Sequence, residues 1–361
     1  MKITFILPHA GLAGGIRVVA IYAKHLRIRG HAVTVISLPK PPLTLKQRIK
    51  HLLNKKEWPV QKREPSYFDD VNVEHKVLEK VRPITNNDVP DADVIVATWW
   101  ETAEWVNALS ALKGKKFYFI QGFEAGLGPH LPIDRVKTTY TLPLHKIAIS
   151  QWLVDIMCND YGDNDVSLVP NSVDSVFFDA PERSKQLIPT VGFLYSTSEF
   201  KGYDVIREAL NRVRSKFPQL RIVSFGACVP TSSLPLPANT EFQYRPSQEK
   251  IREIYSSCDY WLFGSRSEGF GLPLLEAMAC RTPVIATPAG AAPELVKRGG
   301  GFLIDGYDAT ALTQAILMAL VLPDVQWVRL SRKARATATS SSWKETALLF
   351  EKALLSSPKS S

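Results

Sequence analysis

The sequence predicts an α/β protein made of two Rossmann-like, doubly wound domains that face each other across a cleft. Two observations lead to this prediction. The chain has 361 residues, a length that exceeds one ordinary hydrophobic core and suits two domains of about 150 to 180 residues. A pattern of apolar strand, glycine-bearing loop, helix and second strand opens the chain and returns near residue 190. Parallel strands joined by such crossover helices form doubly wound sheets.

The first unit is predicted from the opening residues. A strand, a loop, a helix and a second strand are expected over residues 2–8, 9–14, about 15–29 and 32–37. Gly30 directly follows the helix, where a glycine commonly caps the last turn. These elements form the first βαβ unit.

The second unit repeats this order. Its strand, loop, helix and next strand are "TVGFLY", "STSEFKG", "YDVIREALNRVRSKF" and "QLRIVSFG". The helix has apolar residues at i, i+4 spacing, which is typical of a helix packed on a sheet. Further strands are expected at 260–265 and 283–287. We predict a first domain at residues 1–170 and a second at 171–341, with a C-terminal helix at about 342–356 that returns to the first domain.

Charge and composition limit the partners. The net charge is +9, from 44 Lys and Arg against 35 Asp and Glu, which indicates an anionic partner: nucleic acid, nucleotide phosphates or an acidic membrane. Residues 40–63 carry eight Lys or Arg and one Glu. This stretch is either a solvated loop with a short helix or a basic amphipathic patch for anionic lipid or a lipid-linked substrate.

The expected location is the cytoplasm, with residues 40–63 as the candidate contact to the inner face of the plasma membrane. No secretory apolar region follows Met1, and the longest apolar run, 315–322, is far below the ~20 residues that span a bilayer. The four cysteines show no zinc-binding spacing, so reduced thiols and no metal site are expected.

Two loops are candidates for contact with phosphate. The loop "HAGLAGG" lacks the G-x-G-x-x-G pattern, and no acidic residue ends the second strand, which argues against a dinucleotide oxidoreductase. Gly14 and Gly15 still let the backbone approach an anion at a helix start. Lys201 lies just before a helix of the second unit and is placed to neutralise a phosphate. A purely structural turn and an exposed lysine remain alternatives for these residues.

The stretch "SRSEGFGLPLLEAMAC" at 265–280 is more specific. Pro273 suits a helix start, so Glu268 is expected in a loop and Glu276 one turn into a helix. Two carboxylates on either side of a bend with bare N–H groups suit a ligand that has hydroxyls at both ends and phosphate between them. A nucleotide sugar is such a ligand. The alternative is a helix glutamate favoured by the helix dipole and a surface loop glutamate.

These motifs resemble those of the retaining glycosyltransferases of family 4, which have the GT-B fold, and of their bacterial cell-envelope and exopolysaccharide members. The stretch 268–276 is similar to the E-x7-E motif of that family, and "LVPNSVD" at 168–174 to its domain junction, with Ser172 in place of a glycine. The "FKG" at 200–202, the glycine pair at 14–15 and the segment 292–305 also match, in the right order along nearly the whole chain.

The resemblance implies roles for single residues. Glu268 would bind the hydroxyls of the donor sugar, Glu276 the ribose, and Lys201 the diphosphate, with Gly15 against the far phosphate. Glu268 and Lys201 would be the catalytic pair. The remaining donor contacts implied are the Gly14 loop, the amides of Phe270, Gly271 and Leu272, and a base site near Tyr244 and Arg245.

Two departures from the family pattern concern the donor. Phe193 stands where the family has an arginine that pairs with the lysine on the diphosphate, so a second cation is expected from Arg266 or Arg17, or is absent. The family also has a histidine near the C6 hydroxyl of the sugar. Gln121 or Glu124 is expected to substitute for it.

The resemblance implies transfer of a hexose, glucose favoured, from a UDP sugar to a glycan or lipid-linked glycan in polysaccharide biosynthesis. Neither a metal nor a further cofactor is implied. The alternatives are a nucleotide-sugar epimerase of the same fold, a non-catalytic sugar-binding protein, and a basic nucleic-acid-binding protein, although few aromatics accompany the basic stretch and no nucleic-acid partner is expected. Trp99, Trp100 and Trp105 are either a sugar-stacking face or core residues.

Overall fold

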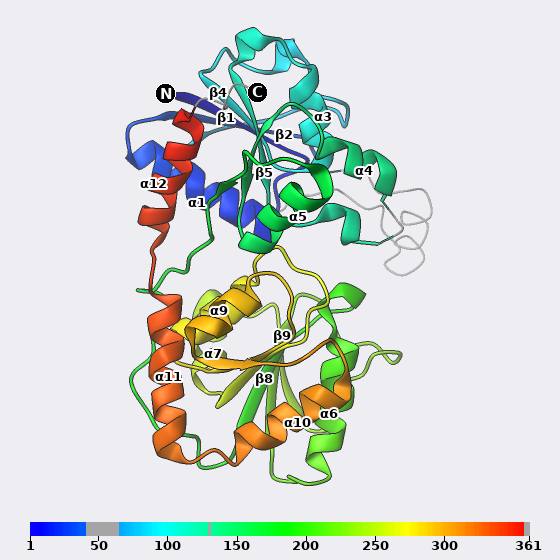
Figure 1. The fold of residues 1–361 in the computed structure, drawn as a ribbon, viewed down its shortest axis with the longest axis vertical. Helices are drawn as coiled ribbons and strands as arrows, with labels where there is room; N and C mark the ends of the chain where they lie inside the picture. Colours follow the sequence, from blue (N-terminus) through cyan, green and yellow to red (C-terminus); the bar gives the residue numbers. More distant parts are fainter. Residues whose placement is uncertain (41–64, 129–130, 357–361) are drawn as a thin grey trace, which may run out of the picture.

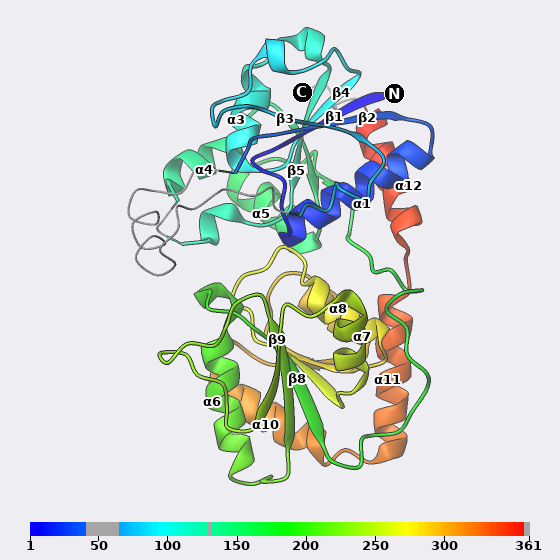
Figure 2. The same cartoon turned by 180° about the vertical axis from the view of Figure 1, so that it is seen from behind.

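The computed structural model of the protein describes residues 1–40, 65–128 and 131–356. These residues form two α/β domains, one above the other in Figures 1 and 2, each built on a parallel sheet with helices on both sides. This confirms the predicted fold class. The basic stretch 40–63 lies almost entirely outside the described residues.

The sheet of the first domain has the order β3-β2-β1-β4-β5-β6-β7, and all of its pairings are parallel. Its strands are β1 (Lys2–Leu7), β2 (Ala32–Ser37), β3 (Glu74–Val77), β4 (Val94–Ala97), β5 (Lys115–Ile120), β6 (His145–Ala148) and β7 (Ser167–Leu168). The central strands are buried on both faces, as expected of a parallel sheet covered by helices.

The helices of this domain begin with α1 (Gly14–Ile28), one residue before the predicted start. Gly30 follows with a φ of +90° and donates its N–H to the carbonyl of Arg27, so it ends the helix as predicted. The other helices are α3 (Trp100–Ala108), α4 (Ile133–Thr139) and α5 (Gln151–Tyr161), with short 3₁₀ turns at Asn86–Asp88, Ala111–Lys113 and Glu124–Gly126.

The sheet of the second domain has the order β10-β9-β8-β11-β12-β13. Its strands are β8 (Thr190–Tyr195), β9 (Arg221–Gly226), β10 (Thr240–Tyr244), β11 (Tyr260–Phe263), β12 (Val284–Ala286) and β13 (Gly301–Leu303). Its helices are α6 (Tyr203–Arg214), α7 (Gln248–Ser256), α8 (Leu272–Ala279), α9 (Ala292–Arg298), α10 (Ala309–Leu320) and α11 (Asp324–Ala338), and a 3₁₀ turn covers Glu199–Lys201. In both sheets the strand order reverses between the first and fourth strands, where ligands of such folds bind.

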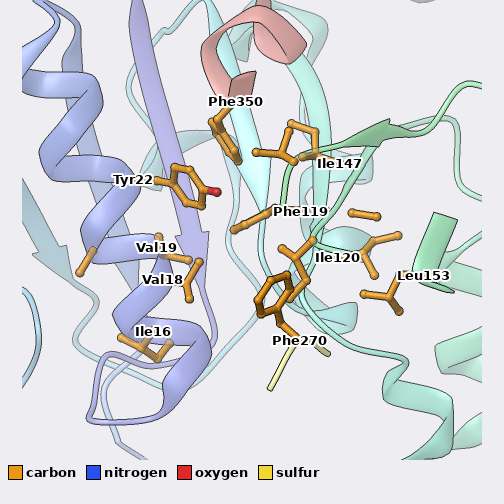
Figure 3. Close-up of a cluster of buried hydrophobic side chains, with 14 of the residues drawn as sticks. Ile16, Val18, Val19, Tyr22, Phe119, Ile120, Ile147, Leu153, Phe270 and Phe350 are labelled. Atoms are coloured by element: carbon orange, nitrogen blue, oxygen red, sulfur yellow. The ribbon is translucent and has the colours of Figure 1, made fainter. Parts of the chain in front are cut away.

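The chain crosses between the domains twice. After α11, helix α12 (Trp343–Leu355) lies beside α1 on the first domain, as both views show. Its Phe350 stacks on Tyr22 at a centroid distance of 4.6 Å and meets Phe119 edge-on at 5.0 Å (Figure 3). A hydrogen bond links the two segments that cross between the domains: the Ser172 hydroxyl donates to the carbonyl of Ser341 at 2.7 Å.

Within the described residues, no single helix has the length and apolar character needed to span a bilayer; α10 with the segment 324–355 meets that test only as a pair bent by 116°.

Candidate active site

A cavity of about 430 Å³ lies between the two domains. Loops after β1, β4 and β5 form its wall in the first domain, and the loops after β8 and β11 form its wall in the second. The residues that line it are Pro8, His9, Ala13, Gly15, Ile16, Thr98, Trp99, Glu101, Gln121–Glu124, Leu127, Phe200 and Ser267–Gly269. The carboxyl ends of both sheets therefore face one hollow.

The loop between β11 and α8 carries Glu268 and is fixed by its backbone. The N–H groups of Arg266 and Ser267 donate to the carbonyl of Phe200 at 2.7 and 3.3 Å. Gly271 ends the loop with a φ of +100° as the N-cap of α8, a conformation that glycine adopts without strain. The loop thus turns sharply into the helix, as the glycines and Pro273 predict.

Lys201 and Glu268 form an ion pair in this loop region, with Nζ 2.5 Å from Oε1. The Ser265 hydroxyl donates to the same oxygen at 3.0 Å. Gly202 holds the lysine turn against β11, because a Cβ at this glycine would lie 1.8 Å from the carbonyl oxygen of Gly264. The two residues expected to be catalytic are therefore in direct contact.

Glu276 is buried in the second turn of α8 and is held from both domains. Its Oε1 accepts from Nη1 of Arg17 on α1 at 2.6 Å, and its Oε2 from the Tyr255 hydroxyl on α7 at 3.1 Å. Burial raises the pKa of the Glu276 carboxyl, and the charge of Arg17 opposes this increase. Sequence reasoning did not assign this pairing or Tyr255, although Arg17 follows Gly15 by only two residues.

Gly15 and Gln121 meet on the first-domain wall. A Cβ at Gly15 would lie 3.4 Å from both terminal atoms of the Gln121 amide, so glycine permits this close approach. The Gln121 Oε1 is buried and has no hydrogen-bond partner among the described residues. A buried carbonyl without a partner costs free energy, and this one lines the cavity. A ligand N–H or hydroxyl at this position would satisfy it.

Among the candidate site residues predicted from the sequence, Gly15, Gln121, Glu124 and Glu268 line this cavity. The other candidates do not line it: Gly14, Arg17, Lys201, Tyr244, Arg245, Arg266, Phe270, Gly271, Leu272 and Glu276. Arg266 makes a two-fold contact with Asp204, at 2.7 and 2.6 Å, and also donates to the carbonyl of Glu199. Tyr244 and Arg245 lie at the end of the edge strand β10, where the Arg245 guanidinium is 5.3 Å from the Tyr244 ring centroid. Phe193 is fully buried in its domain, stacked on Tyr203.

The three tryptophans divide between the two alternatives. Trp99 lines the cavity, whereas Trp100 and Trp105 are buried in the core. Glu124 also lines the cavity, and its Oε2 accepts from the N–H of Trp100 at 2.9 Å. Burial raises the pKa of Glu124 to about 8, so this carboxyl retains its proton at neutral pH.

The backbone of the β11–α8 loop also contacts the first domain. The Gly269 carbonyl accepts from the Ser150 hydroxyl and from Nε1 of Trp152, each at 2.9 Å. Phe270 is buried in the same cluster as Ile120 of the first domain (Figure 3). Direct contacts between the domains therefore lie next to the cavity.

The second domain has a recognisable relative. Residues 178–337 match the family of glycosyl transferases group 1. The group 1 segment therefore covers β8 to α11, including the loop with Glu268.

D-inositol 3-phosphate glycosyltransferase of Corynebacterium jeikeium is 29% identical over 194 residues, which are 48% of this chain and 46% of that protein. The enzyme of the same name from Rhodococcus opacus is 34% identical over 117 residues, 32% of this chain and 26% of that protein. The chain spans about half the length or less of these curated relatives.

Solved structures resemble the chain over its full length and support the GT-B fold. Anabaena Alr3699/HepE in complex with UDP and glucose superposes with a TM-score of 0.74 at 18% identity, covering 99% of this chain and 100% of that chain. Sucrose-phosphate synthase from Thermosynechococcus elongatus gives a TM-score of 0.68 at 16% identity, covering 98% of both chains. The two parallel sheets that face a shared cavity are thus the GT-B arrangement.

Proposed function

We propose that this protein is a retaining glycosyltransferase that moves a hexose, with glucose favoured, from a UDP sugar to a glycan or lipid-linked glycan in polysaccharide biosynthesis. The observation that carries the proposal is the cavity between the domains, which Glu268, the ion-pair partner of Lys201, lines together with Gly15 and Gln121. The group 1 segment supports glycosyl transfer. The bound UDP and glucose named for Anabaena HepE support the choice of donor.

In this proposal the protein stabilises the leaving group. The bond between the sugar anomeric carbon and the phosphate oxygen breaks, and a bond to the acceptor oxygen forms on the same face. The acceptor proton passes to the leaving phosphate, so no separate base is required. Lys201 and the N–H groups at the starts of α1 and α8 are fixed donors aimed at the developing negative charge. Glu268 holds the sugar hydroxyls, and no metal ion or further cofactor takes part.

The acceptor in this proposal is a neutral, hydroxyl-rich glycan surface. The described residues that line the cavity include Glu101, Glu124 and Glu268 but neither lysine nor arginine. Carboxyl groups hydrogen-bond hydroxyls, and the described lining offers no lysine or arginine to a phosphate of the acceptor. Trp99 offers a ring on which a sugar can stack. This lining favours a neutral acceptor group over the phosphate that the names of the curated relatives specify.

We further propose that the protein works in the cytoplasm, peripheral to the inner face of the plasma membrane. The support is the basic composition of residues 40–63, which suits anionic lipid. Binding to vesicles with and without anionic lipid, measured on the wild type and on a variant with the lysines of this stretch replaced by glutamine, tests this part separately.

A thermal-shift panel of UDP, GDP, ADP and dTDP sugars tests the proposed donor, because a bound ligand raises the melting temperature by mass action. We expect the largest shift with UDP-glucose. Proton NMR of the first transfer product then reports the anomeric configuration, which we expect to be retained. An inverted centre, or conversion of the UDP sugar with no acceptor present, would instead indicate another enzyme class.

Removal of either member of the Lys201–Glu268 pair is expected to slow transfer. Lys201→Ala and Glu268→Ala should each lower the rate at least about tenfold, which equals ~1.4 kcal/mol in the barrier. The readout is nucleotide release that depends on acceptor, with Lys250→Ala on the exposed face of α7 as the control. Wild-type rates in both site variants would refute the assignment of this pair.

A further inference from the structure

The resembled family has an arginine for the diphosphate on the first strand of its second domain, but this chain has no cation at that position. Phe193 occupies it, and this side chain is fully buried and packed on Tyr203 with ring centroids 5.3 Å apart. Strand β8 therefore contributes no positive charge there. A donor diphosphate would be left with Lys201 as its cation from this domain unless another side chain reaches it.

Arg266 is unsuited to this role in the described structure. Its two terminal nitrogens are taken by both carboxylate oxygens of Asp204, and Nη1 also donates to the carbonyl of Glu199. A two-fold arginine–carboxylate contact is geometrically specific. The pair faces a different hollow, which Ser196 and Tyr203 also line. Use of Arg266 at the diphosphate would require this pair to break.

Arg17 is the other arginine that the sequence offered as a second cation. It is in the first turn of α1, two residues after Gly15, and its guanidinium crosses the interface to Glu276 on α8. It therefore reaches from the first turn of α1 to the second turn of α8, and the N–H groups and dipole at the start of each helix favour an anion. The ring of Phe178, on the chain crossing, lies 5.9 Å below its guanidinium.

The two glutamates of the Glu268–Glu276 stretch are paired in the same manner. Lys201 contacts Glu268, and Arg17 contacts Glu276. Each pair thus joins a carboxylate suited to hydroxyls with a cation suited to phosphate. A nucleotide diphosphate sugar has hydroxyls on either side of its two phosphates. Its hydroxyls could therefore bind the two carboxylates, and its phosphates could bind the two cations.

We propose that Arg17 is the second diphosphate ligand and that its ion pair with Glu276 is exchanged when the donor binds. In the exchange the guanidinium moves to the phosphate oxygens, and the Glu276 carboxylate is released to the ribose hydroxyls. Until then the pair keeps the buried carboxylate neutralised, since an unpaired charge there is strongly destabilising. This inference rests on the proposed nucleotide-sugar function.

The test compares the binding of UDP and uridine, which differ only in the diphosphate. Isothermal titration of the wild type, of Arg17→Met and of Lys24→Met gives both affinities. Lys24 is exposed on the same helix, roughly 10 Å further along its axis at 1.5 Å per residue, and is the matched control. We expect R17M to weaken UDP binding at least about tenfold, or ~1.4 kcal/mol, and not to weaken uridine binding, because Glu276 no longer has to leave Arg17 to reach the ribose.

A second pair of variants, made in protein that already carries Glu276→Gln, separates an effect on binding from a loss of folding. In Glu276→Gln the buried carboxylate is gone, so replacing Arg17 leaves no unpaired buried charge. The ratio of UDP to uridine affinity should again fall at least about tenfold when R17M is added to E276Q. Equal losses for UDP and uridine, or no loss for either, would overturn the proposal and leave Arg17 a structural partner of Glu276. Wild-type protein that binds neither UDP nor UDP-glucose would count instead against the proposed function.

Discussion

At the scale of single residues, the buried Glu124 has an unusual environment. Its Oε2 accepts from the Trp100 N–H and from the Tyr118 hydroxyl, at 2.9 and 3.0 Å, while its own N–H donates to the Tyr140 hydroxyl at 2.9 Å. Burial is the main cause that raises its pKa to about 8, and these hydrogen bonds oppose the increase only in part. The side chain therefore acts as a neutral group in the cavity wall at neutral pH.

The raised pKa makes stability depend on pH. An ordinary glutamate releases its proton near 4.5 in the unfolded chain, whereas the folded protein keeps it to about 8. The favourable contribution is thus complete below pH 4.5 and is lost as the pH rises to about 8. Glu124→Gln keeps the shape and the acceptor oxygen but cannot ionise.

We therefore expect E124Q to gain stability relative to the wild type by a few kcal/mol between about pH 5 and about pH 9, because one pKa unit equals ~1.4 kcal/mol. Urea unfolding of both proteins at these two pH values measures the difference. The same replacement at the exposed Glu79 is the control. A difference between E124Q and wild type that is the same at both pH values would contradict the explanation.

At the scale of elements, both local and tertiary interactions stabilise helix α12. Ser342 and Glu345 form a reciprocal capping box that starts it, a feature that stabilises a helix N-terminus locally. Trp343, Ala347 and Phe350 are buried at i, i+4, i+7 spacing, which directs one face onto the first domain. Local and tertiary interactions thus favour the same helix.

Phe350→Ala is expected to destabilise the first domain by about 3–5 kcal/mol, because it removes a fully buried ring from the cluster with Tyr22 and Phe119. Chemical denaturation should show the loss in the transition of the first domain. Leu349→Ala changes the neighbouring side chain, which is 43% exposed, and should cost much less. Similar losses for the two variants would show that the ring packing of α12 is not the cause.

At the scale of the whole molecule, backbone contact at Gly269 determines how closely the domains approach. A Cβ at this position would lie 1.8 Å from the carbonyl oxygen of Gln121 in the opposite domain. The Gly269 carbonyl also accepts the Ser150 and Trp152 hydrogen bonds. Any residue with a Cβ atom would require the loop to move, so only glycine fits this contact.

Gly269→Ala is therefore expected to open the cleft and to lower the proposed glycosyl transfer at least about tenfold, since Glu268 and Gln121 would no longer share one cavity. Small-angle scattering should show a larger radius of gyration than in the wild type. Gly122→Ala is the control for shape, because its Cβ would lie at an ordinary 3.9 Å from the Gly269 Cα. An unchanged radius together with full activity in G269A would contradict this view of the interface.

The sequence by itself determined the elements of this protein and the local shape of its main motif. Strand and helix periods, Gly30 after α1, and the glycines with Pro273 before α8 all act within a few residues, so they are readable without the fold. The order of the two βαβ patterns then predicts the two sheets. Lys201 and Glu268, each proposed from its own motif, also belong to one domain, and the structure brings them into contact.

Tertiary structure alone decided which charged groups meet. Arg17 and Glu276 are 259 residues apart, and their contact depends on the position of one domain against the other, which no local pattern encodes. Arg266 is paired with Asp204, and Phe193 is enclosed by the core of the second domain. Whether a side chain is buried, paired or open to a ligand depends on every element packed around it. For that reason the candidate ligands of the diphosphate could be listed from the sequence, but only the folded arrangement distinguishes among them.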